Sequence, residues 1–110
     1  MSFRRKSLAM CVLTSSMADV YAPTALVTGL IHNILLHNKS GVSAQVDISF
    51  YDAASSLSYS LYALTVASGD TVNLGYYNEG LIVPGGCRLR ARSAADAVNM
   101  KVDGTEETTT

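Results

Sequence analysis

The residues that most often carry out chemistry in proteins are few in this sequence and poorly spaced for it. His32 and His37 are five residues apart, which places them on opposite faces of a strand and misses the i, i+4 spacing of a helical metal pair. The sequence has no phosphate-binding loop, nucleophile elbow or CxxC motif, and no pattern supports a dyad of Cys87 with a histidine. We therefore expect no enzyme activity, no cofactor and no metal site.

The remaining reactive side chains have ordinary structural interpretations. Asp52 and Asp70 fall in predicted turns, where aspartate commonly caps the backbone. The two cysteines, Cys11 and Cys87, are too few for a disulfide framework. They could pair if strands bring them together, but two buried thiols acting as small apolar side chains are the favoured interpretation.

Three arginines form a ladder along one predicted strand, because Arg88, Arg90 and Arg92 alternate with apolar residues and so share one face. One interpretation is a contact with an acidic surface of a partner or with nucleic acid. The other is a solvated face whose arginines pair with carboxylates such as Asp47 across the sheet. The net charge of −1 favours the second interpretation and argues against a nucleic-acid partner.

Aromatic residues offer a second candidate surface, since the chain has six tyrosines and no tryptophan. Tyr59 and Tyr62 lie on opposite faces of a predicted strand, and Tyr76 and Tyr77 fall in the loop before Gly80. Exposed tyrosines are frequent in protein contacts, and core tyrosines with bonded hydroxyls are as frequent. Tyr76 and Tyr77 are therefore candidates for an interface or a carbohydrate contact.

The elements that would position these side chains are strands, because apolar and polar residues alternate along most of the chain. In Val42–Tyr51 the apolar side chains from Val42 to Phe50 point one way, and the polar ones between them point the other. Turn residues separate such runs, and Asn38–Gly41 predicts a hairpin loop. The other predicted strands are Leu8–Leu13, Leu57–Val66, Thr71–Leu74, Gly80–Val83, Cys87–Ser93 and Ala97–Val102. This spacing predicts an all-β chain, folded as a single antiparallel β-sandwich of about seven to eight strands, either jelly-roll or immunoglobulin-like.

The segment Ala25–His37 is apolar on both alternating faces and is harder to assign. A helix is possible, because Leu26, Leu30 and Ile34 follow helical spacing. A strand is preferred, because Gly29 is a poor helix residue and a turn follows directly. In a strand, Leu26, Leu30 and Ile34 share one face. A strand that is apolar on both faces is either central in the sandwich or covered by another subunit.

Length and composition describe one domain with a small charged fraction. The 110 residues are enough for one domain with its own core. Hydrophobic residues make up 48% and charged residues 15%, against about 25% charged residues in an average soluble domain. A protein so poor in charge either covers part of its surface with partners, which we favour, or is coated with Ser and Thr. No apolar run approaches the roughly 18 residues of a membrane helix, so no membrane partner is expected.

The expected domain organisation is a basic N-terminal arm (1–7), a β-sandwich domain (8–104) and a flexible C-terminal tail (105–110) that has no apolar side chain. The arm, with Arg4, Arg5 and Lys6 before Leu8–Leu13, also resembles a secretory signal. Its apolar run is shorter than the roughly 7–15 residues of a signal's core, so we interpret it as the lead into a first strand.

Several short motifs follow one another along the chain in a recognisable order. They are Val20-Tyr21-Ala22-Pro23-Thr24, Asn38 at the end of an aliphatic strand, Gly69-Asp70-Thr71-Val72-Asn73-Leu74, Pro84-Gly85-Gly86, and a final strand leading to Gly104 and Glu106. In this order they resemble small virion structural proteins of tailed bacteriophages, of the β-sandwich kind found in capsid decoration, neck and tail, over residues 12–107. The chain departs from that pattern at Ala25-Leu26, where Gly-Lys is usual, and at Gly85-Gly86, where Gly-Asp is usual.

The resemblance implies a non-enzymatic virion protein, assembled in the bacterial host cytoplasm, that forms homo-oligomers and docks on the capsid or head–tail assembly through other virion proteins. It supplies no catalytic residue. One alternative is a receptor- or glycan-binding module of a tail fibre, and another is a secreted adhesin-like domain whose N-terminus acts as a signal. The interface candidates are Arg88, Arg90, Arg92, Leu26, Leu30, Ile34, Tyr76 and Tyr77.

Overall fold

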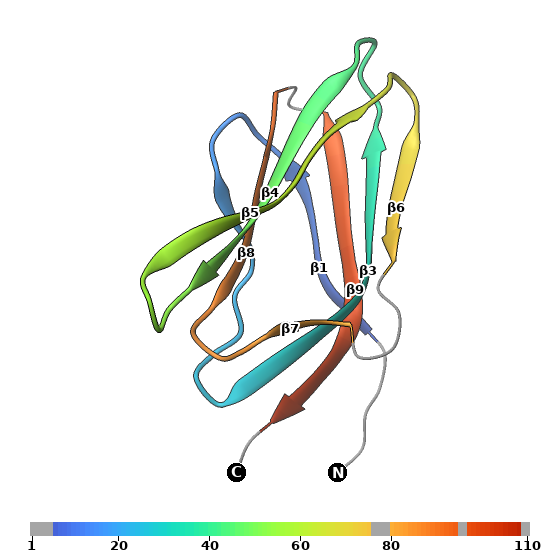
Figure 1. Ribbon diagram of the computed structural model, residues 1–110. Helices are drawn as coiled ribbons and strands as arrows, with labels where there is room; N and C mark the ends of the chain where they lie inside the picture. Colours follow the sequence, from blue (N-terminus) through green and yellow to red (C-terminus); the bar gives the residue numbers. More distant parts are fainter. Residues whose placement is uncertain (1–5, 76–79, 95–96, 109–110) are drawn as a thin grey trace.

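Nine strands make up the fold in the computed structural model, which describes residues 6–75, 80–94 and 97–108 (Figure 1). They are β1 (Lys6–Leu13), β2 (Ala18–Tyr21), β3 (Val27–Asn38), β4 (Ala44–Asp52), β5 (Leu57–Val66), β6 (Thr71–Gly75), β7 (Leu81–Val83), β8 (Arg88–Ser93) and β9 (Val98–Thr108). These ranges contain no helix, so the all-β prediction is confirmed and Ala25–His37 supplies a strand rather than a helix. The short strand β2 was not anticipated, because four residues are too few to show an alternating pattern.

The strands form two antiparallel sheets that pack face to face, as predicted for a β-sandwich (Figure 1). Sheet A has the order β1-β9-β3-β6, with β7 also pairing with β3, and sheet B has the order β2-β8-β4-β5. Most connections cross from one sheet to the other, including those from β1 to β2, β2 to β3, β3 to β4 and β8 to β9. This is the winding of a jelly roll, whereas an immunoglobulin-like domain keeps its first two strands in one sheet.

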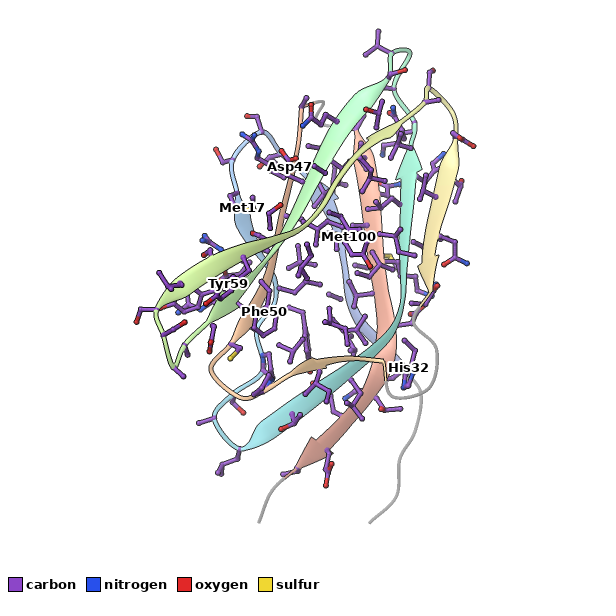
Figure 2. All side chains as sticks on the ribbon, in the orientation of Figure 1. Met17, His32, Asp47, Phe50, Tyr59 and Met100 are labelled. Carbon is purple, nitrogen blue, oxygen red and sulfur yellow. The ribbon has the colours of Figure 1, made fainter. Side chains whose placement is uncertain are left out.

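The predicted inward faces fill the space between the sheets (Figure 2). The alternation expected for Val42–Tyr51 and Cys87–Ser93 is confirmed for β8 and for Ala44–Ile48 of β4. Val42 precedes β4 and is exposed, and Ser49, expected on the wet face, is buried. The largest fully buried side chains come from both sheets and are Ile31, Ile34, Leu36, Ile48, Leu89 and Met100. Each of these strands therefore has one face in a common core.

A β-bulge divides β3 into two halves with opposite inward faces. The register between β3 and β9 shifts between Ile31 and Asn33, so His32 is an extra residue. Because side chains alternate along a strand, one extra residue exchanges the two faces. Ile31 is buried before the bulge and Ile34 is buried after it. The prediction that Leu30 and Ile34 share a face is therefore wrong.

Strand structure extends further at both ends than the expected sandwich boundaries at 8 and 104. β1 begins at Lys6, and β9 continues to Thr108. Residues 105–108, expected as tail, have no apolar side chain, but their backbone pairs with residues 27–30 of β3. Backbone pairing leaves no trace in a hydrophobic pattern, which is why the sequence suggested a flexible end.

The turn at 38–41 is not a hairpin, because it joins β3 of sheet A to β4 of sheet B. Asn38 is fully buried at this corner, and its side-chain amide donates to the carbonyl oxygens of Val42 (2.8 Å) and Val66 (2.9 Å). Its Oδ1 accepts from the backbone N–H (2.9 Å) and the hydroxyl (2.7 Å) of Ser40. One side chain thus satisfies the backbone where the chain changes sheets.

Candidate interaction surface

Two long strands lie at free sheet edges with almost no charge on them. β5 runs for ten residues without a charged side chain or proline, and β1 has one charge in eight residues, at Lys6. Among the described strands none pairs with the outer edge of β1 or of β5. Edge strands offer unpaired N–H and C=O groups to other chains, and monomeric proteins usually protect them with charges or proline. These two edges carry little protection by charge or proline, although each strand has one β-bulge, at Leu8 in β1 and at Leu61 in β5.

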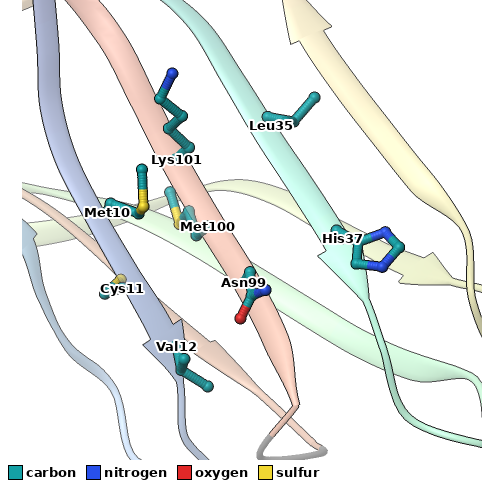
Figure 3. A pocket seen from close by; sticks show the side chains of 8 residues that line it. All are labelled: Met10, Cys11, Val12, Leu35, His37, Asn99, Met100 and Lys101. Carbon is teal, nitrogen blue, oxygen red and sulfur yellow. The ribbon is translucent and has the colours of Figure 1, made fainter.

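The surface beside β1 is apolar and hollowed. Met10 and Val12 are 69% and 50% exposed on the outer face of sheet A. They line a hollow of about 430 Å³, which we call the outer hollow. Figure 3 shows the side chains around it, from β1, β9 and β3: Met10, Cys11, Val12, Leu35, His37, Asn99, Met100 and Lys101. Its polar groups come from the neighbouring strands, so β1 itself presents only apolar side chains here.

The other free edge is apolar as well. Leu57, Tyr59 and Leu61 of β5 are 55%, 49% and 37% exposed. The end of the β4–β5 hairpin that carries Leu57 and Tyr59 projects from the body of the sandwich in Figures 1 and 2. The chain therefore exposes an apolar strand at one edge of each sheet.

The arginine ladder lies on the outer face of sheet B, as predicted. Its ion pairs are Arg88–Asp19 (3.6 Å), Arg90–Asp19 (2.9 Å) and Arg92–Asp47 (2.9 Å). Arg88 also stacks over the ring of Tyr51, 5.3 Å from its centroid. The pairing with Asp47 across the sheet agrees with the structural interpretation of the ladder. Exposed pairs of this kind contribute about 0–1 kcal/mol each. Because the three arginines pair with two aspartates, the ladder is a solvated surface whose charge is mostly neutralised.

The other interface candidates differ in how far the fold exposes them to solvent. Leu26 is 64% exposed just before β3, and Leu30 is half-buried. Ile34 is fully buried in the core, so it cannot contact a partner of the folded chain; the β-bulge at His32 is the reason. Tyr76 and Tyr77 lie outside the described residues.

The two histidines do not come together. His37 lines the outer hollow and shares a hydrogen bond of 2.8 Å with the hydroxyl of Thr71. His32 lines a separate hollow with Lys6 and Asp103. Among the described residues, no group of three or more His, Cys, Asp or Glu side chains is arranged to hold a metal ion. Cys11 and Cys87 are both free thiols, and burial raises the pKa of Cys11.

A polar cluster that the sequence did not reveal links the two sheets. The hydroxyl of Tyr21 in sheet B donates to Glu106 in sheet A at 2.6 Å, and Lys6 forms an ion pair with the same carboxylate. The hydrogen bonds from Lys6 and from Tyr21 lower the pKa of Glu106. Burial, together with Glu106, raises the pKa of Tyr21. Both Tyr21 and Glu106 occur in the motifs noted above, but only the fold brings them into contact.

The cluster also explains a glycine in β3. The ring of Tyr21 lies against Gly29, where an added Cβ would overlap the ring. The tyrosine can therefore cross from one sheet to the other only because position 29 has no side chain.

Comparisons with known proteins identify the fold rather than a family. No family model and no curated protein matches the chain. Among solved structures, a subunit from Bacillus endospore appendages, described as a novel family of disulfide-linked pili, is similar with a TM-score of 0.58 and 14% identity over 99% of this chain and 90% of that one. At this identity the likeness shows a shared fold.

Two further solved structures are less similar. One is a pentameric capsid protein from metagenomic phage sequences, with a TM-score of 0.38 and 15% identity over 93% of this chain and 64% of that one. The other contains CBM22-1 and GH10 modules of the Clostridium thermocellum xylanase Xyn10B, with a TM-score of 0.42 and 11% identity over 98% of this chain and 25% of that one.

The described ranges contain no helix of the length and apolarity needed to cross a membrane.

Proposed function

We propose that this chain is a non-enzymatic structural subunit of a phage virion, which forms homo-oligomers and docks on the capsid or head–tail assembly. The observation that carries the proposal is the uncovered apolar surface of β1, where Met10 and Val12 stand exposed beside the outer hollow. Covering apolar surface gains about 25 cal/mol for each Å² removed from water. A contiguous surface of this kind is typical of an interface with another protein.

Composition and motif order support the same function. Charged residues are only 15% of the chain, and the two long sheet edges carry almost none of them. A jelly roll occurs in capsid and lectin domains alike, and a fold does not fix a function. The virion assignment therefore rests on the resemblance of the motif order to phage structural proteins, and the assembly role rests on the surface.

The test of the virion assignment is the protein composition of phage particles purified by density gradient from a culture that produces this chain. We expect the chain in the particles at a copy number that is a multiple of their symmetry. A chain that is expressed but stays in the lysate, absent from the particles, would contradict the assignment.

The test of the docking surface uses particles that lack the chain. Wild-type protein should saturate them, and the variant Met10→Ser/Val12→Thr should bind at least tenfold more weakly, which corresponds to a loss of about 1.4 kcal/mol. Ile82→Ser is the matched control, because Ile82 is 47% exposed on β7, away from β1. Equal binding of all three proteins would show that the surface of β1 is not the docking surface.

A further inference from the structure

Charge is distributed unevenly along the chain. Residues 40–87 contain Asp47, Asp52, Asp70 and Glu79 but no Lys or Arg. This segment supplies β4 to β7 and with them the edge strands β5 and β6. The eight cations are Arg4, Arg5, Lys6, Lys39, Arg88, Arg90, Arg92 and Lys101. Apart from Lys39, they precede β1 or belong to β1, β8 and β9.

The two free edges therefore differ in the charges at their ends. β5 is flanked by Asp52, the last residue of β4, and by Asp70 in the turn that follows it. β1 starts at Lys6, which forms an ion pair with Glu106 and follows Arg4 and Arg5 in the sequence. Both strands are otherwise uncharged and similar in length, ten and eight residues. The edges are thus alike in shape and apolarity but opposite in terminal charge.

This difference favours one of the ways in which two copies could join. Pairing β5 with β5 of a second copy would bring two acid-flanked edges together. Pairing β1 with β1 about a two-fold axis is antiparallel, so it would set the basic start of each strand beside the uncharged end of the other and gain no charge complementarity. Pairing β1 with β5 instead sets basic residues near an acidic strand end, whichever way the strands run. Complementary charges favour the right partner, and like charges penalise the wrong one.

We propose that β5 of one copy pairs with β1 of the next, so that sheet B of one subunit continues into sheet A of its neighbour. This inference rests on the proposed assembly function and names the partner as a second copy of this chain. The added backbone hydrogen bonds would satisfy both edges. The exposed side chains of Leu57 and Tyr59, which share a face of β5, would become cross-strand neighbours of Met10 and Val12, which share a face of β1.

The proposed contact has a direction. Each subunit has one β1 and one β5, so pairing at one edge leaves the other free. Contacts of this head-to-tail kind generate a ring when the rotation between subunits closes and a filament when it does not. Because a pairing of two identical edges stops at a dimer, the two modes can be distinguished by experiment.

The experiment uses two variants, each blocked at one edge by lysines, as natural edge strands are. The β1-blocked variant is Met10→Lys/Val12→Lys, and the β5-blocked variant is Leu57→Lys/Tyr59→Lys. The control is Val42→Lys, at a residue that is 64% exposed in the connection between β3 and β4. Native mass spectrometry under reducing conditions reports the oligomers, and circular dichroism verifies that each variant folds. A variant that fails to fold is replaced by its single substitution, Val12→Lys or Leu61→Lys.

The expected results are specific to pairing of unlike edges. Wild type and control should form the same oligomers, and each blocked variant should be monomeric alone. An equimolar mixture of the two blocked variants should form a heterodimer with one copy of each and nothing larger, because one intact β1 and one intact β5 remain.

Other outcomes overturn the inference. Self-association of a blocked variant would indicate pairing of like edges or another surface, and a mixture that stays monomeric would show that β1 and β5 do not bind each other. A wild-type chain that is monomeric at all concentrations would also overturn it. The virion assignment is decided independently, by the composition of the particles.

Discussion

Two small groups of polar side chains hold the sheets together at opposite ends of β3. Near its start, Tyr21 reaches across the sandwich past Gly29 to Glu106. At its end, Asn38 bonds the backbone where the chain passes into sheet B. Each group satisfies polar atoms that would be costly to bury alone. These contacts hold one sheet against the other at sites where apolar packing alone would leave polar atoms unpaired.

The acid stability of the chain should depend on Glu106. Its pKa is lower in the folded protein than the ordinary value of 4.5, so the unfolded chain binds more protons as the pH falls. The stability contributed by the carboxylate is therefore complete above that ordinary value and is lost as the pH falls through the lower, folded value. Glu106→Gln should be less stable than wild type by about 1 kcal/mol at pH 7, and it should lose less stability on acidification.

Urea unfolding at pH 7, 5, 4 and 3 measures this difference. Glu107→Gln is the matched control, since it removes the same charge from the neighbouring residue of β9 without touching the cluster. The free energies of wild type and Glu106→Gln should converge at low pH. Parallel curves would show that Glu106 is not the responsible group.

Among the elements, β3 shows most clearly how backbone geometry modifies a side-chain pattern. Its sequence is apolar at both odd and even positions, which suggested two apolar faces along the whole strand. The bulge at His32 instead directs Ile31 inward in the first half and Ile34 inward in the second. The apolar residues at both odd and even positions thus partly belong to one core face, which is formed by odd-numbered residues before the bulge and by even-numbered residues after it. Part of the expected interface on β3 is core.

Alanine substitutions in β3 test this arrangement. Ile34→Ala should cost about 2–5 kcal/mol of unfolding free energy, because it opens a cavity in the core. Leu30→Ala should cost less than about 2 kcal/mol, because Leu30 is only half-buried. Chemical denaturation of the two variants measures both values. Equal costs would support a strand without the bulge, in which the two residues share a face.

The molecule as a whole combines one buried core with two long sheet edges that carry almost no charge. Among the described residues, sixteen apolar side chains form one buried core, so the subunit has a core of its own. Its two long, nearly uncharged edges are β1 and β5, and they carry five of the exposed large apolar side chains: Met10, Val12, Leu57, Tyr59 and Leu61. We therefore interpret the small charged fraction as a property of surfaces that are covered after folding, when subunits meet.

Assembly should make thermal stability depend on protein concentration. A partner that binds only the folded chain stabilises it by mass action. For wild type we expect the melting temperature to rise by about 4 °C or more over a 100-fold increase in concentration. The β1-blocked variant should melt at one temperature throughout, as measured by circular dichroism. A wild-type melting temperature that does not change with concentration would show that the subunits do not associate in this range.

The sequence was sufficient for features that depend on neighbouring residues along the chain. Alternation within one strand requires only that a sheet has an inside and an outside, so β4, β8 and the start of β9 could be predicted with their faces. The outward arginines and their pairing with Asp47 follow from the same alternation. The scarcity of charge and the all-β class were also evident before the structure.

The tertiary structure decided what depends on residues far apart. The sheet orders that make this a jelly roll, the bulge at His32 and the pairing of residues 105–108 with β3 all arise from long-range backbone hydrogen bonds, which no local side-chain pattern records. The contact between Tyr21 and Glu106 joins residues 85 positions apart. Which strands lie at free edges also emerges only when all pairings are made, and for that reason the surface of β1 could not be found from its sequence.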